Sequence, residues 1–211
     1  MSACLQGCFG VLCLLLVVNG PLPETLAKEP MRKTVATIEG ETFRINGQPT
    51  YKGRTWKGKK IGEGTRVSIV GYVESAHYSD VNDGESVNCE LTGDENNDIH
   101  VPIVQTAGAD ECSSVTAEIT PHYRPNVWTA ANLNKPQVPL RFTGHLLFDA
   151  EHKPCRGTTV EEPKRQSVWE VHPVYSIDVC VANNVSQCDA SDEKVWLALD
   201  TWLKQQPPAK H

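Results

Sequence analysis

The sequence predicts a mainly β chain built around an OB-like five-stranded barrel, with an inserted strand, an N-terminal hairpin and a C-terminal helix. The first observation is the stretch 169–180, in which β-branched and aromatic residues alternate with polar ones, as in a half-buried strand. The second is an internal echo. Residues 65–77 and 138–150 each combine an alternating strand, a mid-strand glycine and a further apolar run. Such a glycine marks the bend where a long strand turns a barrel corner, and a β-sandwich is the alternative fold.

Residues 1–27 have the pattern of a signal peptide. The run Phe9–Val18 is apolar apart from Gly10 and Cys13, which suits a signal-peptide core and is too short to span a bilayer. Small residues before position 28 allow cleavage after Ala27. Because the first eight residues lack Lys and Arg, a retained membrane anchor is the alternative. We therefore expect a secreted or periplasmic protein that meets a membrane only through this segment before cleavage.

Residues 28–63 are expected to form a lead-in with one hairpin. Phe43–Tyr51 alternates around Asn46-Gly47, and both of these residues accept the positive φ that a tight hairpin turn needs. This stretch resembles the N-terminal hairpin of some secreted bacterial proteins thought to act on carbohydrates. The resemblance implies export and brings no catalytic position.

Residues 64–181 are the expected barrel. Between its two long bent strands the sequence alternates over short stretches separated by polar turns. We expect strands at 87–92, 98–104 and 114–120, a turn at 94–97 and a short helix at 128–133. Pro173 interrupts the final strand and has no N–H to donate, so the strand should bend there, lie at an edge or change its partner.

Residues 182–211 are expected to contain a C-terminal helix packed on the barrel. Its apolar residues recur at helical spacing over about four turns, which predicts one stripe facing the core. The stripe consists of Val195, Trp196, Leu199, Trp202 and Leu203. Asp189 or Ser191 can cap its first turn, because a side-chain oxygen there accepts from free backbone N–H groups.

Five cysteines follow the predicted signal peptide, and no two of them form a CxxC pair, so disulfides are favoured over a zinc site. They are Cys89, Cys112, Cys155, Cys180 and Cys188. The short reversal between Cys180 and Cys188 predicts a bridge between these two. A second bridge is expected between Cys89 and Cys112, which leaves Cys155 unpaired.

The charge balance and the motifs limit the function. The chain has 26 acidic and 20 basic residues and a net charge of −6, which makes nucleic acid an unlikely partner. No Ser-His-Asp order, glycine-rich phosphate loop or Cys-His pairing stands out, so covalent catalysis has no support.

Three strands carry residues that suit a polar site. Asp98 and His100 share one face of their strand, Glu170 and His172 share one face of theirs, and Glu118 lies on a third. If these faces coincide, their nitrogen and carboxylate oxygen atoms suit one divalent metal ion. The alternative is the ordinary solvated side of an antiparallel sheet.

Several motifs along the barrel carry a family resemblance. They are Asp98-x-His100, Glu118-Ile119-Thr120-Pro121-x-x-Arg124, Phe142-x-Gly144-x-Leu146-x-x-Asp149 and Trp169-Glu170-Val171-His172-Pro173-Val174. Together they resemble a group of uncharacterised secreted bacterial proteins that end in a Trp-Glu-Ile-His-Pro-Val-type strand. The resemblance implies an OB-like barrel outside the cytoplasm and no known activity. The paired acidic and arginine motif of OB-fold thermonucleases is not recognisable here.

Two functional hypotheses follow. The first is an exported binding module without a cofactor, whose ligand is an extracytoplasmic carbohydrate, peptide or envelope component. Its expected binding residues are Glu118, Arg124, Trp169, Glu170, His172 and Tyr175. The alternative is a hydrolase that depends on one divalent metal ion. Its expected ligands are Asp98, His100, Glu118, Glu170 and His172.

Overall fold

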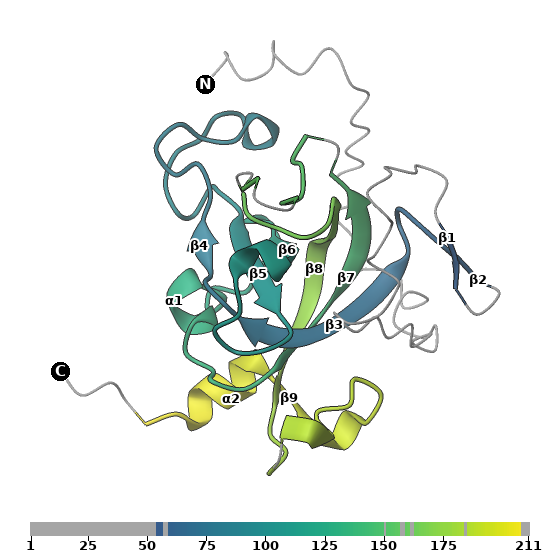
Figure 1. Cartoon of the computed structure of the whole chain (residues 1–211). Coiled ribbons are helices and arrows are strands. Elements are labelled where there is room, and N and C mark those ends of the chain that lie inside the picture. The colour runs from purple at the N-terminus through teal and green to yellow at the C-terminus, as the bar shows by residue number, and fades with distance from the viewer. Residues whose placement is uncertain are drawn as a thin grey trace, which may run out of the picture. The chain divides into compact units, whose positions relative to one another are not determined.

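The structure is a computed structural model that describes residues 54–56, 59–149, 151–156, 159–160, 163–183 and 185–207. The predicted signal peptide and the hairpin around Asn46-Gly47 lie outside these residues. The described part of the predicted lead-in contains a two-stranded antiparallel sheet (Figure 1). It consists of β1 (Arg54–Trp56) and β2 (Lys59–Ile61).

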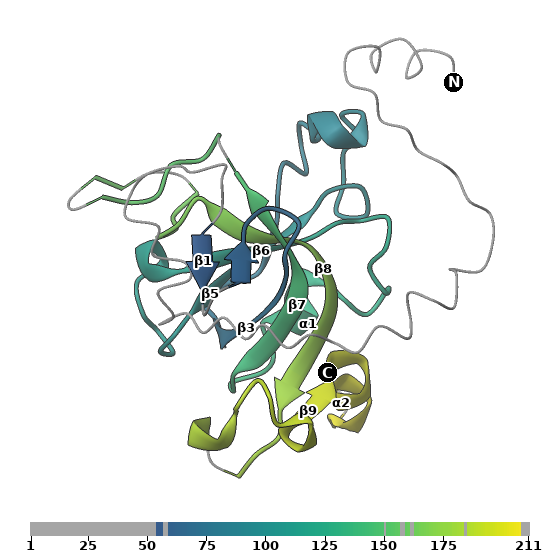
Figure 2. The same cartoon turned by 90° about the vertical axis from the view of Figure 1, so that its right-hand side faces the viewer.

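Five strands close into a barrel (Figures 1 and 2). They are β3 (Arg66–Val73), β5 (Ile99–Val104), β6 (Val115–Ile119), β7 (Leu140–Phe148) and β8 (Trp169–Cys180). Their order is β3-β7-β8-β6-β5, and a pairing between β3 and β5 closes the circle. The β6–β8 pair is parallel and the other pairs are antiparallel. The prediction of a mainly β chain built around a five-stranded barrel is therefore confirmed.

Both mid-strand glycines lie where the barrel bends. β3 pairs with β7 up to Gly71 and with β5 from Tyr72 onward, so the strand changes partner at the glycine. At Gly144 the β7–β8 register shifts. A Cβ on Gly144 would lie 2.3 Å from the carbonyl oxygen of Pro173, so only glycine permits this approach of the two strands.

Pro173 marks a change of partner in β8. A cis peptide bond precedes it, and β7 accompanies β8 on one side throughout. On the other side β8 pairs with β6 at Val171 and with β9 (Trp196–Ala198) from Asp178 onward. Of the three outcomes predicted for this proline, the change of partner is confirmed.

The core fills the barrel with the apolar side chains of alternate strand positions. Ile69, Val101, Ala117, Phe142 and Val171 are at most 1% exposed and represent its five strands. The residues between these positions point to the outer face, so the alternation in the sequence fixes which side chains can form a site.

The segment before β5 corrects one predicted strand. Residues 87–92 do not extend, because the chain forms a short 3₁₀ turn, η1 (Ser86–Asn88), and then takes positive φ at Cys89 and Glu90. The Glu85 carboxylate stabilises this turn by accepting from Asn88 Nδ2 at 2.7 Å and from the Ser79 hydroxyl. The extra strand on this side is instead β4 (His77–Tyr78), which pairs with β5.

The other elements predicted in the middle of the chain are confirmed. Strands β5 and β6 lie within the predicted stretches 98–104 and 114–120. The predicted short helix is α1 (Ala130–Leu133), where the Thr129 side chain accepts from the Asn132 amide at the N-terminus.

The C-terminal helix is shorter than predicted. Residues Glu193–Val195 form the 3₁₀ turn η4, Trp196–Ala198 form β9, and only α2 (Leu199–Gln205) is helical. The predicted start at Asp189 or Ser191 is therefore wrong. Arg141 explains the difference, because its guanidinium donates to Asp178, Glu193 and the Ala190 carbonyl oxygen, and so holds this segment beside the open edge of β8.

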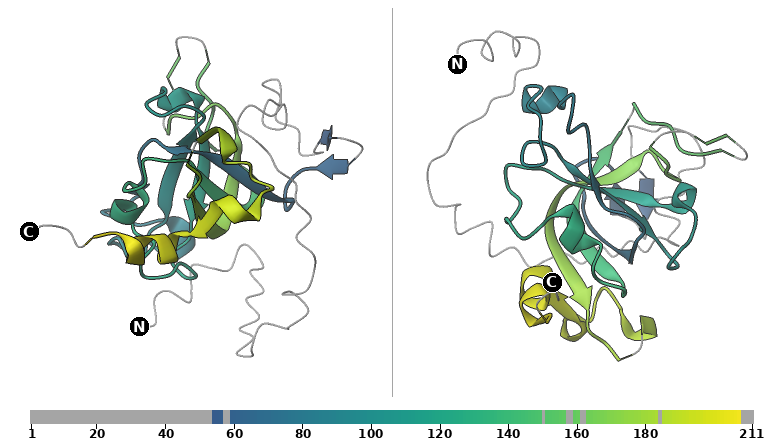
Figure 3. Two further views of the ribbon diagram at one scale, coloured as in Figure 1. Left: turned by 90° about the horizontal axis from the view of Figure 1, so that it is seen from below. Right: turned by 90° about the vertical axis from the view of Figure 1, so that its left-hand side faces the viewer.

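Helix α2 packs on the barrel at the end opposite the β4–β5 and β7–β8 loops (Figures 1 and 3). Leu199 is fully buried, and Trp202 and Leu203 pack against the core. Trp128 Nε1 donates to Asp200 Oδ1 at 2.7 Å, which joins the helix to the segment before α1. Within the described part of the chain, no helix is long and apolar enough to cross a membrane.

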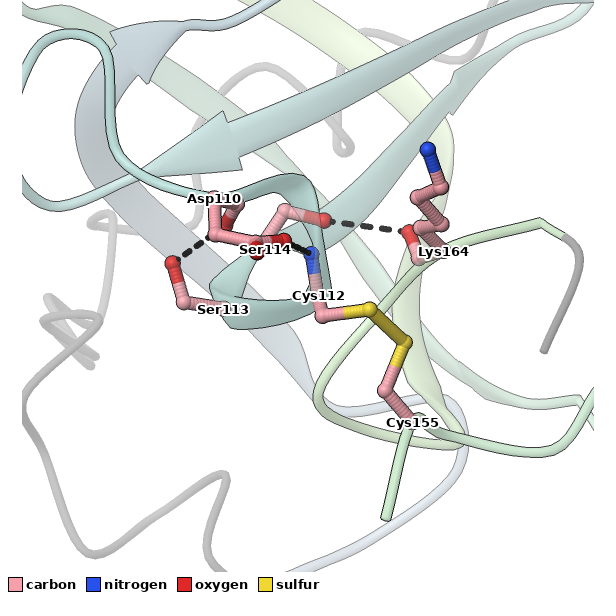
Figure 4. Close-up of a disulfide and its surroundings, with 6 residues drawn as sticks. All are labelled: Asp110, Cys112, Ser113, Ser114, Cys155 and Lys164. Carbon is pink, nitrogen blue, oxygen red and sulfur yellow. Dashed lines mark hydrogen bonds between the residues drawn. A yellow bond between two sulfur atoms is a disulfide. The ribbon is translucent and has the colours of Figure 1, made fainter. Parts of the chain in front are cut away.

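The described residues contain two disulfides, and one of these differs from the prediction. Cys180–Cys188 is confirmed, whereas Cys112 bonds to Cys155 rather than to Cys89 (Figure 4). Cys89 lies exposed in the turn that replaces the predicted strand 87–92. Two disulfides are typical of a protein from an oxidising compartment outside the cytoplasm.

Candidate functional site

A polar cluster lies on the outer face of β5, β6 and β8. His100 is directly opposite Glu118 in the β5–β6 pair, and Ala117 is opposite Val171 in the parallel β6–β8 pair. Because Ala117 and Val171 point into the core, their neighbours along the strands point outward and meet across the pair. The local alternation and the barrel closure together therefore assemble the site.

Glu118 is the centre of the cluster. Its Oε1 lies 2.7 Å from His100 Nε2, and its Oε2 lies 2.6 Å from His172 Nδ1. Burial by itself would raise the pKa of Glu118, but the hydrogen bonds from the two imidazoles lower it well below its usual range. Burial opposes protonation of the imidazoles, yet Glu118 and Glu170 raise the pKa of His172 to about 10. The hydrogen bond to Glu118 also raises the pKa of His100, against the effect of burial.

Glu170 extends the cluster into the protein. Its Oε1 is 3.3 Å from His172 Nδ1 and its Oε2 is 3.2 Å from Arg165 Nη1. Arg165 Nη1 also donates to Asp149 Oδ2 at 2.8 Å, and Asp149 contacts His152 Nδ1 at 2.7 Å. Burial raises the pKa of Glu170, against the opposing effects of His172 and Arg165. A continuous row of charged groups therefore runs from the outer face to the loop that precedes β8.

Arg165 is fully buried, and its Nε and Nη2 have no hydrogen-bond partner among the described residues. Its position is fixed by the loop itself, since its carbonyl oxygen accepts from the Cys155 amide at 2.8 Å. The Cys112–Cys155 bridge ties this loop to the turn before β6, and the Ser114 hydroxyl donates to the Lys164 carbonyl oxygen (Figure 4). The disulfide therefore supports one side of the cluster.

Asp98 lies at the other side, at the end of the segment that leads into β5. Its side chain is 6% exposed, and Oδ2 is 3.8 Å from His172 Nε2, which is longer than a hydrogen bond. Burial, Glu85 and Glu118 raise the pKa of Asp98 to about 6. Its backbone is held firmly, because the amide donates to Glu85 Oε1 at 3.3 Å and the carbonyl oxygen accepts from the Ser79 amide at 3.0 Å.

Two long loops flank the cluster. One joins β4 to β5 and ends at Asp98, and the other joins β7 to β8 and contains Arg165. Figures 1 and 2 show both loops at the same end of the barrel, away from α2. Four of the five clustered residues thus lie on strands, and Asp98 lies at the end of a loop.

The structure brings five of the predicted site residues together and places three elsewhere. Asp98, His100, Glu118, Glu170 and His172 form the cluster. Trp169 lies in the core instead, where its ring meets Phe148 edge to face. Tyr175 is exposed and pairs with His145, 3.1 Å away. Arg124 supports a loop, since its guanidinium donates to the carbonyl oxygens of Asn97 and Asp94 and lies over the Tyr78 ring.

Sequence reasoning missed three charged members of the site. Glu85 and Arg165 lie in loops without periodicity, so no local pattern identifies them. Asp149 appeared only as the last residue of a motif on β7. Its carboxylate also caps the following turn by accepting from the Glu151 amide at 3.0 Å.

The cluster supplies hydrogen-bond acceptors, donors and metal-ligating atoms within a small volume. Ligand atoms of Asp98, Glu118 and His172 all lie within 4.8 Å of one another. Carboxylate oxygen and imidazole nitrogen are ligands of first-row divalent metals, and the same atoms can bind the hydroxyl and amide groups of an organic ligand.

Comparison with known proteins adds no relative: the chain matches no family model, and no curated protein or solved structure is significantly similar to it. The resemblance to secreted bacterial proteins therefore stays a prediction.

Proposed function

We propose that this chain is an exported protein whose barrel is an OB-fold, and that it binds an extracytoplasmic ligand on the outer face of β5, β6 and β8. One observation carries the proposal: five ionisable side chains meet on this face, largely buried between two loops. Buried ion pairs are a costly way to stabilise a fold, because each charge loses its hydration. Their convergence is better explained by a ligand that they bind.

The place of the cluster in the barrel supports the same proposal. β5 and β6 are the second and third barrel strands, and the flanking loops follow the first and fourth strands. OB-folds bind oligosaccharides and oligonucleotides on the face of these two strands, between these two loops. The acidic net charge of −6 favours the saccharide.

A carbohydrate suits the chemistry of this face. Sugar hydroxyls both donate and accept, and the cluster offers the Asp98 carboxylate as an acceptor beside Nε2 of His172, which lies 3.8 Å from it. Tyr123 is 84% exposed and follows β6 close to Arg124, whose guanidinium contacts the backbone next to Asp98. An exposed aromatic ring at the rim can stack on a sugar ring while the polar groups set its orientation.

The test uses the exported protein and three soluble hexasaccharides, of N-acetylglucosamine, glucose and galacturonic acid. We expect at least one of them to shift the amide NMR signals of β5, β6 and β8 at millimolar concentration. His172→Gln should weaken this binding about tenfold or more, because it removes a charged hydrogen-bond donor. The control His145→Gln, on β7, should bind like the wild type. If none of the three sugars shifts an amide signal, or if the shifts are confined to other strands, the proposal is contradicted.

A metal-dependent hydrolase is the second candidate, and the 4.8 Å grouping of Asp98, Glu118 and His172 is the observation that favours it. Hydrolysis requires a bound ion with an open position for water. This candidate therefore depends on metal binding at these residues.

A further inference from the structure

We propose that Asp98, Glu118 and His172 form a binding site for one first-row divalent transition metal ion such as Zn²⁺. The ligands are Nε2 of His172 and one carboxylate oxygen each from Asp98 and Glu118. This inference extends the proposed function by naming a cation, and it rests on that function only in using the same face of the barrel.

The orientation of His172 favours this role. Its Nδ1 lies 2.6 Å from Glu118 Oε2 and 3.3 Å from Glu170 Oε1, so this nitrogen carries a proton. Its Nε2 points toward Asp98. A histidine that binds a metal usually donates its other ring N–H to a carboxylate, which fixes the ring and increases the basicity of the ligating nitrogen. Glu170 supplies such a carboxylate here.

Asp98 provides a second ligand, whose carboxylate has no close partner among the described residues. Its carboxylate is almost fully buried, and its nearest ionic contact among the described residues is His172 Nε2 at 3.8 Å. Zinc bonds of about 2.0–2.2 Å place neighbouring tetrahedral ligand atoms about 3.4 Å apart. The observed gap is therefore too wide for a hydrogen bond and close to the width that a bound ion needs.

Glu118 completes three protein ligands and leaves a position for water. Its ligand atom lies within 4.8 Å of those of Asp98 and His172, so a small side-chain movement brings it to the ion. The two carboxylates balance the charge of a divalent ion. The imidazole nitrogen favours zinc and its neighbours over Ca²⁺ and Mg²⁺, which prefer oxygen ligands.

Zinc titration of the exported protein, made without a polyhistidine tag and stripped with EDTA, tests the site at pH 8. We expect one Zn²⁺ per chain by calorimetry and by metal analysis after dialysis, and no comparable binding of Ca²⁺ or Mg²⁺. Asp98→Asn and His172→Gln should each weaken zinc binding at least about 100-fold, and Glu170→Gln about 10-fold, as expected for an orienting residue. The matched control His145→Gln should bind like the wild type.

The imidazole NMR spectrum of the wild type keeps the test independent of how the variants fold. Zinc should shift the Nε2 signal of His172 while its Nδ1 stays protonated. An unchanged Nε2 signal, the absence of stoichiometric zinc, or equal affinity in folded His172→Gln would overturn the inference. Sugar titrations with and without EDTA separate the two proposals. If the protein binds a sugar but binds no zinc, only the proposed function stands. If it binds zinc but none of the sugars, only the metal site stands.

Discussion

Glu118 accepts hydrogen bonds from two imidazoles in a largely buried setting, and this arrangement couples the charge of three side chains. Its low pKa and the high pKa of His172 favour the ionised pair at neutral pH. Removing either partner leaves a largely buried charge with one hydrogen-bonded counter-charge fewer, which is usually more costly than the pair is favourable.

The first prediction concerns His172 and pH in the metal-free protein. Its pKa is raised to about 10 in the folded state, above the unfolded value of about 6.5. A raised folded pKa means that this contribution to stability is complete below about pH 6.5 and is lost as pH rises through about 10. Urea unfolding in EDTA should therefore show that His172→Gln loses more free energy of unfolding at pH 7 than at pH 10. Equal losses at both pH values would show that the ion pair contributes nothing.

At the scale of elements, the contact between Gly144 on β7 and Pro173 on β8 determines how the two strands bend. The strands approach so closely that the Pro173 carbonyl oxygen occupies the space of a side chain. The shift of the β7–β8 register at Gly144 follows from this approach. His172 is the residue directly before Pro173. The bend therefore helps to direct the imidazole toward β6.

The second prediction is that Gly144→Ala lowers the free energy of unfolding by about 1–3 kcal/mol through overpacking. The added Cβ would lie 2.3 Å from the Pro173 oxygen and 2.6 Å from Val171 Cγ1, so the strands must separate. Gly64→Ala is the control, because no atom lies within 4 Å of its Cβ and only the positive φ of +77° opposes it. Thermal unfolding should rank Gly144→Ala as the more destabilised protein. The reverse order would mean that the close approach is not tight in solution.

At the scale of the whole molecule, the two disulfides act on different parts. Cys112–Cys155 joins residues 43 positions apart and supports the loop that carries Arg165, whereas Cys180–Cys188 joins residues 8 positions apart near β9. Only the first bridge is connected to the polar cluster.

The third prediction compares the removal of each bridge. The chain-entropy estimate is about 4 kcal/mol for Cys112–Cys155 and about 2.5 kcal/mol for Cys180–Cys188, because the longer loop loses more freedom in the unfolded state. The double variant Cys112→Ala/Cys155→Ala should therefore unfold at lower urea concentration than Cys180→Ala/Cys188→Ala. It should also weaken zinc binding, while the second double variant should not. Equal effects of the two double variants on zinc binding would show that the loop carrying Arg165 does not support the site.

The sequence by itself determined the features that depend on neighbouring residues. Period-2 alternation predicted β8 over 169–180 and placed Glu170 and His172 opposite Trp169 and Val171, because a regular pleat allows no other arrangement. Mid-strand glycines predicted the barrel bends, and the short reversal predicted Cys180–Cys188.

Only the tertiary structure decided the features that depend on contacts distant in sequence. Cys112 met Cys155 because the loop between β7 and β8 passes over the turn before β6. Trp196 joined β9 rather than a helix because the edge of β8 offered unpaired backbone groups, which outweigh a helical apolar pattern. Arg165 reached Glu170 through an irregular loop. Local periodicity specifies the direction of a side chain along its own strand, whereas its partners depend on how the barrel closes.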